Sequence, residues 1–242
     1  MKTVSTLIAL VAAACIAAVV WNAREAKVTG PATGGSAAPV VDVAALKAKA
    51  DAGDPEAAYE LAKALVKGEQ GLPNYSEAAR LFEQAVDKGH VEAMVGLADL
   101  YTVGQGVTNS PAEALRLYLA AAGKGNVKAI YSLAGLYEEG RGVKKNQTLA
   151  ARWHQLAAER GMAMAQFNLG QRYDLGLGVK ADLIEAYKWL GLASKGGIKD
   201  ANEMLERLRK KMTKDQIAEA SRRADGFSLV SSAPSLTNGL SP

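Results

Sequence analysis

A 36-residue period covers most of this 242-residue chain and limits the folds available to it. Residues 55–90, 91–126, 127–162 and 163–198 fall into register without gaps at most positions. Alanine and, four residues later, leucine recur in every unit, so both lie on one face of a helix. A period in the thirties with two helices in each unit predicts stacked helical hairpins. The recurring residues are Ala57, Ala93, Ala129, Ala165 and Ala201 with Leu61, Leu97, Leu133, Leu169 and Leu205.

Each unit carries signals for the ends of a first and a second helix. Glycine closes both helices, because it adopts a left-handed backbone without steric cost. A side chain that accepts bonds from free helical N–H groups opens the second helix. In three units a glutamate follows it by three residues, which is the spacing of a capping box. The closing glycines are Gly68, Gly104, Gly140 and Gly176, then Gly89, Gly125, Gly161 and Gly197; the opening residues are Asn74, Ser110, Asn146 and Asp182.

The stretch YEEGRGVKKN, residues 137–146, contains a Gly-x-Gly followed by two lysines, which by itself is typical of a loop that holds a phosphate. Its counterparts 36 residues earlier and later, YTVGQGVTNS and YDLGLGVKAD, do not keep both lysines. A phosphate loop also follows a strand, whereas this stretch follows a predicted helix. The sequence therefore predicts a hinge, in which Gly140 ends one helix, Gly142 permits the bend and Asn146 begins the next helix.

The pattern of alanine, leucine, tyrosine, Gly-x-Gly-Val and Ala-Ala resembles the Sel-one-like repeat, a relative of the tetratricopeptide repeat. VKAIYSLAGLYEEGRGVKKNQTLAARWHQLAAERG and AMAQFNLGQRYDLGLGVKADLIEAYKWLGLASKGG match it almost throughout, and the resemblance covers about residues 42–225. It implies an all-α fold, an αα-hairpin solenoid wound as a right-handed superhelix. Helices within 42–53 and 199–225 are predicted to cap its ends. The first unit departs from the pattern, because GEQGLPN shifts the second glycine by one position.

The segments outside the repeats predict export and a tether. Residues 1–21 carry no charge after Lys2, and three interpretations stay open: an uncleaved membrane anchor, a cleaved signal peptide, or lipidation at Cys15. Each of them predicts export, either to the periplasmic side of the inner membrane or, after cleavage, as a periplasmic or secreted protein. Residues 22–41, rich in glycine, proline and small residues, are predicted to be a flexible linker, and residues 226–242 a disordered tail.

Charge and composition argue against several classes of function. The 29 basic residues are interleaved with 25 acidic ones, so no basic stripe predicts binding to nucleic acid. Two histidines in distant columns and one cysteine in the N-terminal segment form neither a metal site nor a catalytic triad, and no cofactor is predicted. His154 shares its column with Phe82 and Leu190, which predicts a packing residue with satisfied ring nitrogens. His90 is predicted to cap a helix or lie at the surface.

The concave side of the solenoid is the predicted binding site. First helices line that side in helical solenoids, and residues off their buried stripe point into the groove. Apolar and aromatic residues there would anchor a docked helix or extended peptide, with packing against the adjacent repeat as the alternative. Polar residues about one turn on would supply specificity, with surface ion pairs as the alternative. The first set is Tyr59, Val95, Tyr131 and Phe167, and the second is Lys63, Asp99, Glu138, Gln171 and Asp174.

These features predict a non-enzymatic interaction scaffold that binds a protein or peptide partner in its concave groove and meets a membrane through its N-terminal segment. The family resemblance implies roles in the cell envelope, such as assembling complexes, supporting polysaccharide export or restraining a sensor kinase. Two alternatives stay open. A glycan-binding protein would stack sugar rings on the same aromatic residues, and a hydrolase would use the carboxylates of Glu138 and Asp174.

Overall fold

The computed structural model describes residues 42–69 and 71–230, and within these ranges the chain forms helices and no strand. The predicted all-α solenoid of helical hairpins is confirmed. Four hairpins pair α3 with α4, α5 with α6, α7 with α8, and α9 with α10. The helices are α2 (Val43–Asp51), α3 (Pro55–Lys67), α4 (Tyr75–Asp87), α5 (Val91–Val103), α6 (Pro111–Gly123), α7 (Val127–Glu139), α8 (Gln147–Glu159), α9 (Ala163–Leu175), α10 (Leu183–Lys195), α11 (Asp200–Arg209) and α12 (Lys214–Asp225).

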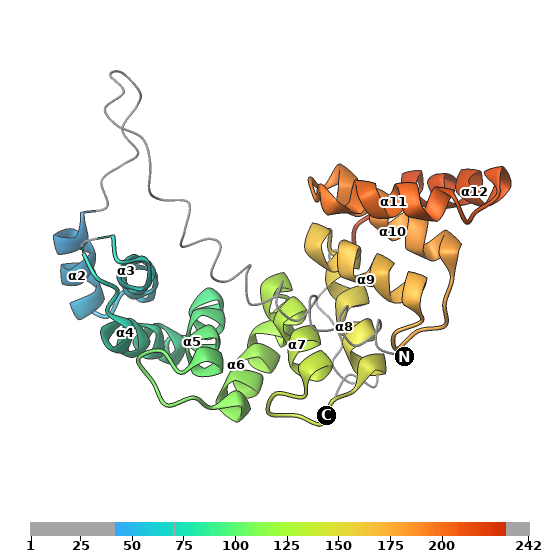
Figure 1. Cartoon of the computed structure of the whole chain (residues 1–242). Helices are drawn as coiled ribbons and strands as arrows, with labels where there is room; N and C mark the ends of the chain where they lie inside the picture. Colours follow the sequence, from blue (N-terminus) through green and yellow to red (C-terminus); the bar gives the residue numbers. More distant parts are fainter. Residues whose placement is uncertain (1–41, 70, 231–242) are drawn as a thin grey trace, which may run out of the picture.

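The helices follow one another along an arc, on whose inner side α3 and α5 lie nearer to the hollow than α4 and α6 (Figure 1). Each hairpin packs on the next through its second helix, so that α4 meets α5, α6 meets α7 and α8 meets α9. At one end α2 packs against α3, and at the other α11 and α12 both pack against α10. The helices in the segments predicted to cap the array therefore pack against its two ends.

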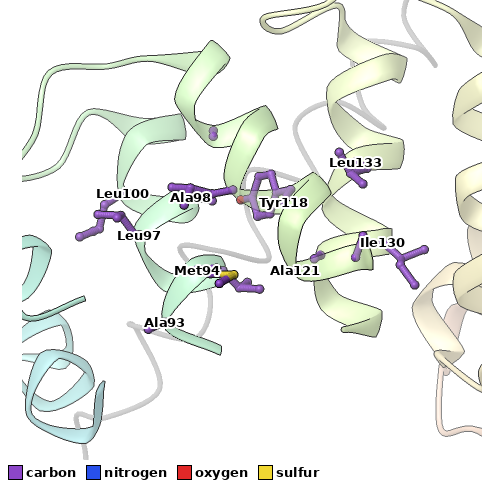
Figure 2. Packing of buried hydrophobic residues seen from close by; sticks show 14 of the residues in the cluster. Ala93, Met94, Leu97, Ala98, Leu100, Tyr118, Ala121, Ile130 and Leu133 are labelled. Carbon is purple, nitrogen blue, oxygen red and sulfur yellow. The ribbon is translucent and has the colours of Figure 1, made fainter. Parts of the chain in front are cut away.

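Alanine occupies many of the places where neighbouring helices touch. In Figure 2, Met94 and Ala98 of α5 lie toward Tyr118 and Ala121 of α6, and Ile130 continues the core into α7. Both alanines are fully buried, at 0% exposure. A side chain of one carbon lets two helices approach closely, and a larger one would force the backbones apart. The alanine columns of the sequence therefore set the spacing of the stack.

The residues predicted to open the second helices do cap them. Asn74 Oδ1 accepts a hydrogen bond from the backbone N–H of Glu77 at 3.2 Å. The glutamate does not complete the predicted capping box, because the N–H of Asn74 donates to the carbonyl of Leu65 at 3.1 Å and thereby closes the hairpin. The Glu77 carboxylate pairs with Arg80 instead, at 2.6 Å. The same closing bond joins Ser110 to Tyr101, Asn146 to Tyr137, and Asp182 to Tyr173.

The two glycines of each Gly-x-Gly turn have different tasks. Gly140, with φ of 79°, takes the left-handed conformation at the end of α7. Gly142 also has a positive φ, and a Cβ on it would lie 2.7 Å from the backbone of Pro111, the first residue of α6 in the preceding hairpin. At Gly178 that carbon would lie 1.9 Å from the carbonyl oxygen of Gln147, the first residue of α8. The predicted hinge is therefore also a place where neighbouring hairpins approach closely.

In the first unit the second glycine is shifted by one position, and the close contact with another hairpin is absent there. Gly71 has φ of 139°, and a Cβ on it would meet nothing within 4 Å. In the described part of the chain the single helix α2, rather than a hairpin, precedes this unit. Its second glycine therefore has no neighbouring hairpin to accommodate.

Several predictions concern residues outside the described ranges, namely the N-terminal segment 1–21 with Cys15, the linker 22–41, and residues 231–242. None of the described helices has the length and apolar character needed to cross a bilayer. Residues 226–230 depart from the predicted disordered tail. The ring of Phe227 lies against Trp189, with 5.4 Å between centroids, and the N–H of Val230 donates to the carbonyl of Glu159 at 2.9 Å. Residues 227–230 therefore contact the repeats, and their aperiodic sequence did not predict these contacts.

The close contact at Gly178 predicts that one added carbon lowers stability there, whereas one added carbon at Gly191 does not. Gly178→Ala should lower the free energy of unfolding by about 2 kcal/mol or more, because the new Cβ meets backbone atoms and the positive φ strains any side chain. Gly191→Ala in α10, where a Cβ meets nothing within 4 Å, should raise it by roughly 0.5 kcal/mol through helix propensity. Urea unfolding followed by circular dichroism measures both. Equal effects of the two substitutions would contradict the proposed close contact.

Candidate functional site

The two tyrosines predicted to line the groove pack against histidine rings. Tyr59 on α3 stacks on His90, with 4.6 Å between ring centroids and 28° between planes. Tyr131 on α7 meets His154 edge on at 5.4 Å, and its hydroxyl oxygen accepts a hydrogen bond from Asn168 at 3.1 Å. Both tyrosines are partly buried. Each ring therefore packs against a residue of its own repeat, and the Tyr131 hydroxyl also meets the next repeat through Asn168.

The other two members of this column are engaged in the same way. Val95 is 3% exposed and belongs to the main core. Phe167 is partly buried and packs against the apolar cluster of α10, α11 and α12. The column is therefore packed fully at Val95 and partly at the other three positions. Contact of Tyr59, Tyr131 and Phe167 with a partner stays a prediction.

Two of the predicted polar residues are held in place by neighbours. Lys63 Nζ lies 2.7 Å from Glu60 Oε1 and 4.7 Å from the ring centroid of Tyr59. Its hydrogen bond to Glu60 raises the pKa of Lys63 above its ordinary value, so the ammonium stays charged. The side-chain amide of Gln171 lies 3.5 Å from the sulfur of Met204. Lys63 therefore presents a fixed positive charge, with 36% of its side chain exposed.

Asp99 ties three helices together. The hydroxyl of Tyr118 on α6 donates to Asp99 Oδ1 at 2.5 Å, and Lys128 Nζ on α7 lies 2.7 Å from Oδ2. Burial and, next to it, the negative charge of Asp99 raise the pKa of Tyr118, which keeps the hydroxyl protonated and able to donate. The side chains of Asp99 and Lys128 are 41% and 62% exposed. The pair is therefore accessible to a partner as well as structural.

A polar cluster, formed by Glu138, Gln147, His154 and Arg172, joins the third and fourth hairpins. Arg172 Nη2 lies 3.0 Å from Glu138 Oε1, while its Nη1 donates to Gln147 Oε1 and to the carbonyl of Leu177, each at 3.1 Å. His154 Nε2 lies 3.6 Å from Glu138 Oε2, beyond hydrogen-bond distance. Glu138, predicted to contact a partner, is thus a tie between α7, α8 and α9.

The charges in this cluster are set by burial and by each other. Burial lowers the pKa of His154, whose side chain is 2% exposed, so the ring is neutral at physiological pH. His154 packs as predicted, but neither ring nitrogen has a hydrogen-bond partner among the described residues. Burial acts to raise the pKa of Glu138, yet His154 and Arg172 outweigh it and hold that pKa below its ordinary value. Glu138 is therefore an anion at neutral pH.

Asp174 is covered by the C-terminal end of the solenoid. Its carboxylate lies 2.6 Å from Arg207 Nη2 and 3.4 Å from Lys211 Nζ, and its side chain is 2% exposed. The bridge joins α9 to α11 and to the turn after it. Within the described ranges no three His, Cys, Asp or Glu side chains lie close enough to hold a metal ion.

Arg172 is a residue that the sequence analysis missed, although its column carried a signal. The equivalent positions one and two units earlier are Leu136 and Leu100, which are 4% and 3% exposed. A cation in a buried leucine column needs an anion nearby. Glu138 and Arg172 could have been paired on that argument. Lys128 had no such signal, because exposed positions tolerate any charge.

Stacked 36-residue hairpins with alanine contacts between helices define a helical-repeat protein. The chain belongs to the Sel1 repeat family, whose sequence pattern matches residues 55–90, 91–126, 127–162 and 163–198. These bounds coincide with the four units of the period, and the resemblance to the Sel-one-like repeat is confirmed. No curated protein sequence matches the chain.

The solved structures that resemble this one include two with 25% sequence identity. A Sel1 repeat protein from Oxalobacter formigenes aligns with a TM-score of 0.62 and 25% identity, over 77% of this chain and 79% of that chain. A protective antigen present in uropathogenic Escherichia coli strains, described as displaying an SLR fold, aligns with a TM-score of 0.51 and 25% identity, over 76% of this chain and 48% of that chain. This chain therefore spans about half the length of the Escherichia coli antigen.

The ion pair of Arg172 predicts strong coupling between two substitutions. Arg172→Leu restores the leucine of the column but leaves the Glu138 carboxylate without its cation, so it should lower the free energy of unfolding by about 2 kcal/mol. Adding Glu138→Gln should recover most of that loss, because no uncompensated charge remains. A double-mutant cycle in urea measures the coupling. Additive effects of the two substitutions would contradict the ion pair.

The cluster also predicts acid sensitivity. The folded pKa of His154 lies below the ordinary 6.5, so as the pH falls through 6.5 the unfolded chain binds a proton that the folded chain refuses, and stability drops. The lowered pKa of Glu138 adds a second loss below 4.5. Urea midpoints at pH 7.5, 5.5 and 4 test this. His154→Phe, the residue of the first unit, should remove the loss above pH 4.5, and an unchanged profile would contradict the assignment.

Proposed function

We propose that this protein is a non-enzymatic scaffold that binds a protein or peptide partner along the inner side of its first helices. Sel1 repeat proteins are generally protein-interaction scaffolds, and this chain carries four such repeats. The observation that carries the finer proposal is the row of positioned polar side chains on successive first helices. Lys63, the Asp99–Lys128 pair and Gln171 recur along the stack and are each held by an intramolecular contact.

Preorganised side chains favour binding because less conformational freedom is lost when the partner docks. Lys63 offers a positive charge, and the next hairpins offer a carboxylate beside Lys128 and then an amide. Such a sequence of groups suits a mixed polar segment rather than a uniformly charged one. The exposed parts of Tyr59 and Tyr131 would add apolar area next to these groups. Val95 contributes only through the packing of its neighbours.

The cell envelope is the proposed location. Its support is the uncharged apolar segment from Leu7 to Trp21, which has the character of an export signal or anchor. The linker at 22–41 would then hold the repeats at a distance from the membrane. Fractionation of cells, with a mass measurement of the mature N-terminus, distinguishes an anchor from a cleaved signal.

The alternatives have less support from the site. A hydrolase would need carboxylates that reach a substrate, whereas Asp174 is enclosed by Arg207 and Lys211. The lowered pKa of Glu138 favours the anion, which suits an ion pair better than proton donation. A glycan-binding surface would need open aromatic faces, and the ring of Tyr59 is stacked on His90. Calorimetry with glycan fragments separates glycan binding from protein binding.

Two pairs of charge reversals test the proposed surface. Lys63→Glu with Lys128→Glu alters the inner side, and Arg80→Glu with Arg116→Glu makes the same charge change on the second helices, at residues that also sit in simple ion pairs. Partners are crosslinked in native membranes and quantified by mass spectrometry. The inner pair should reduce the yield of the main crosslinked partner about tenfold or more, and the control pair should leave it nearly unchanged. Equal losses, or a loss only in the control, would refute the inner surface as the binding site.

A further inference from the structure

The segment from Phe227 to Val230, named here the C-terminal strap, leaves α12 and lies on the second helices of the last two repeats. Phe227 packs edge on against Trp189 of α10, with centroids 5.4 Å apart and 71° between ring planes. The N–H of Val230 donates to the carbonyl of Glu159, the last residue of α8, at 2.9 Å. The strap has no helical or strand structure of its own. It is an extended peptide seated on a helical surface.

The surface beneath the strap offers what an extended peptide needs. The carbonyl of Glu159 is one of the last-turn carbonyls that α8 cannot satisfy within the helix. Gly161, which follows, has no side chain, so Leu229 lies directly over it, and a Cβ there would be 2.9 Å from Leu229 Cδ2. Trp189 supplies the aromatic ring against which Phe227 packs. Together they provide a backbone acceptor and two apolar contacts, the usual elements of peptide recognition.

The strap covers Gly161, whereas the equivalent glycines in the described part of the array are uncovered. The glycines in the same column as Gly161 are all in the left-handed conformation, and a Cβ on any of them would meet nothing within 4 Å. The strap therefore sits at one place in a repeated row. A tryptophan does not by itself mark that place, because Trp153 holds the position equivalent to Trp189 one unit earlier, where its side chain is 0% exposed. These open equivalents are Gly53, Gly89, Gly125 and Gly197.

The strap is loosely held, unlike a core element. Leu229 is 65% exposed and Val230 is 40% exposed, even though both are apolar. One backbone hydrogen bond, one aromatic contact and the contact of Leu229 with Gly161 attach the segment. An attachment of this size can be exchanged for a similar one. A terminal cap required for folding would bury its apolar side chains more fully.

We propose that Trp189, Gly161 and the Glu159 carbonyl form a second peptide-binding site, separate from the inner side of the first helices, and that the C-terminal strap occupies it in cis. The partner that fits is an extended segment with an aromatic residue followed two and three positions later by aliphatic residues, as in the Phe-Ser-Leu-Val of the strap itself. Such a segment binds by displacing the strap. The site is therefore autoinhibited in the isolated protein.

Binding of a strap peptide in trans tests this site. The probe is a fluorescent peptide of residues 226–232, GFSLVSS, added to the full chain and to the chain that lacks residues 227–242. The shortened chain should bind the peptide at least about tenfold more tightly, because a tethered competitor acts at a high effective concentration. A peptide with Phe227→Ala should lose that gain. Equal affinities of the two chains, or equal binding of both peptides, would overturn the proposal.

Trp189→Leu in the shortened chain identifies the receiving surface. Leucine occupies this column in the first two repeats, at Leu81 and Leu117, so the hairpin should fold. Peptide affinity should fall about tenfold, whereas Lys63→Glu with Lys128→Glu should leave it unchanged. The proposal for the inner surface and the proposal for the strap site can thus be refuted independently. Unchanged affinity in the Trp189→Leu variant would overturn the assignment of the site.

Two measurements cover the other outcomes. If the shortened chain does not fold, Phe227→Ala in the full chain takes its place, and faster hydrogen exchange at the Val230 amide with unchanged exchange in α10 reports release of the strap. Light scattering of the full chain distinguishes the cis arrangement from exchange between two copies. A dimer that dissociates on Phe227→Ala would overturn occupation in cis.

Discussion

Close approach between successive hairpins is the constraint on which the rest of the structure depends. At Gly178 a single additional carbon would lie 1.9 Å from the carbonyl oxygen of Gln147, so the turn of one repeat fits directly against the first residue of a helix in the repeat before it. Fully buried alanines such as Ala98 and Ala121 do the same between helices. The arc of Figure 1 is the accumulated result, since the same small offset recurs at every joint.

Two of the joints also carry polar ties, and these ties involve residues that the sequence suggested for partner binding. Asp99 bonds to Tyr118 and Lys128 at one joint, and at the next Glu138 faces Arg172. The two carboxylates differ in what they can still do. Asp99 keeps 41% of its side chain exposed, which leaves it available to a partner, whereas Glu138 is set among buried groups that fix its charge. The same kind of tie therefore leaves Asp99 accessible and places Glu138 beside buried groups.

Much of the helical layout could be predicted from residue type, and the failures have a common cause. Asn74 caps its helix as expected because its partner is three residues away. The capping box failed at the same place because the N–H of Asn74 bonds to Leu65 across the hairpin, a partner that local spacing does not reveal. The prediction for His154 was right that the ring packs in the core and wrong that its nitrogens are hydrogen-bonded. The equivalent residues in other repeats indicate the size of the side chain that fits, but not its hydrogen bonds. The strap was missed because four aperiodic residues carry no pattern.

The sequence by itself determined the period, the helix ends and the buried face of each helix, because caps, glycine turns and apolar columns act within a few residues. Tertiary structure decided which groups meet across repeats. Arg172 reaches Gln147, 25 residues earlier, and Val230 reaches Glu159 only after the chain has passed through α9 to α12. Such contacts depend on the angle and spacing at which whole hairpins stack. That geometry is the sum of many weak packing contacts, and no short stretch of the chain encodes it.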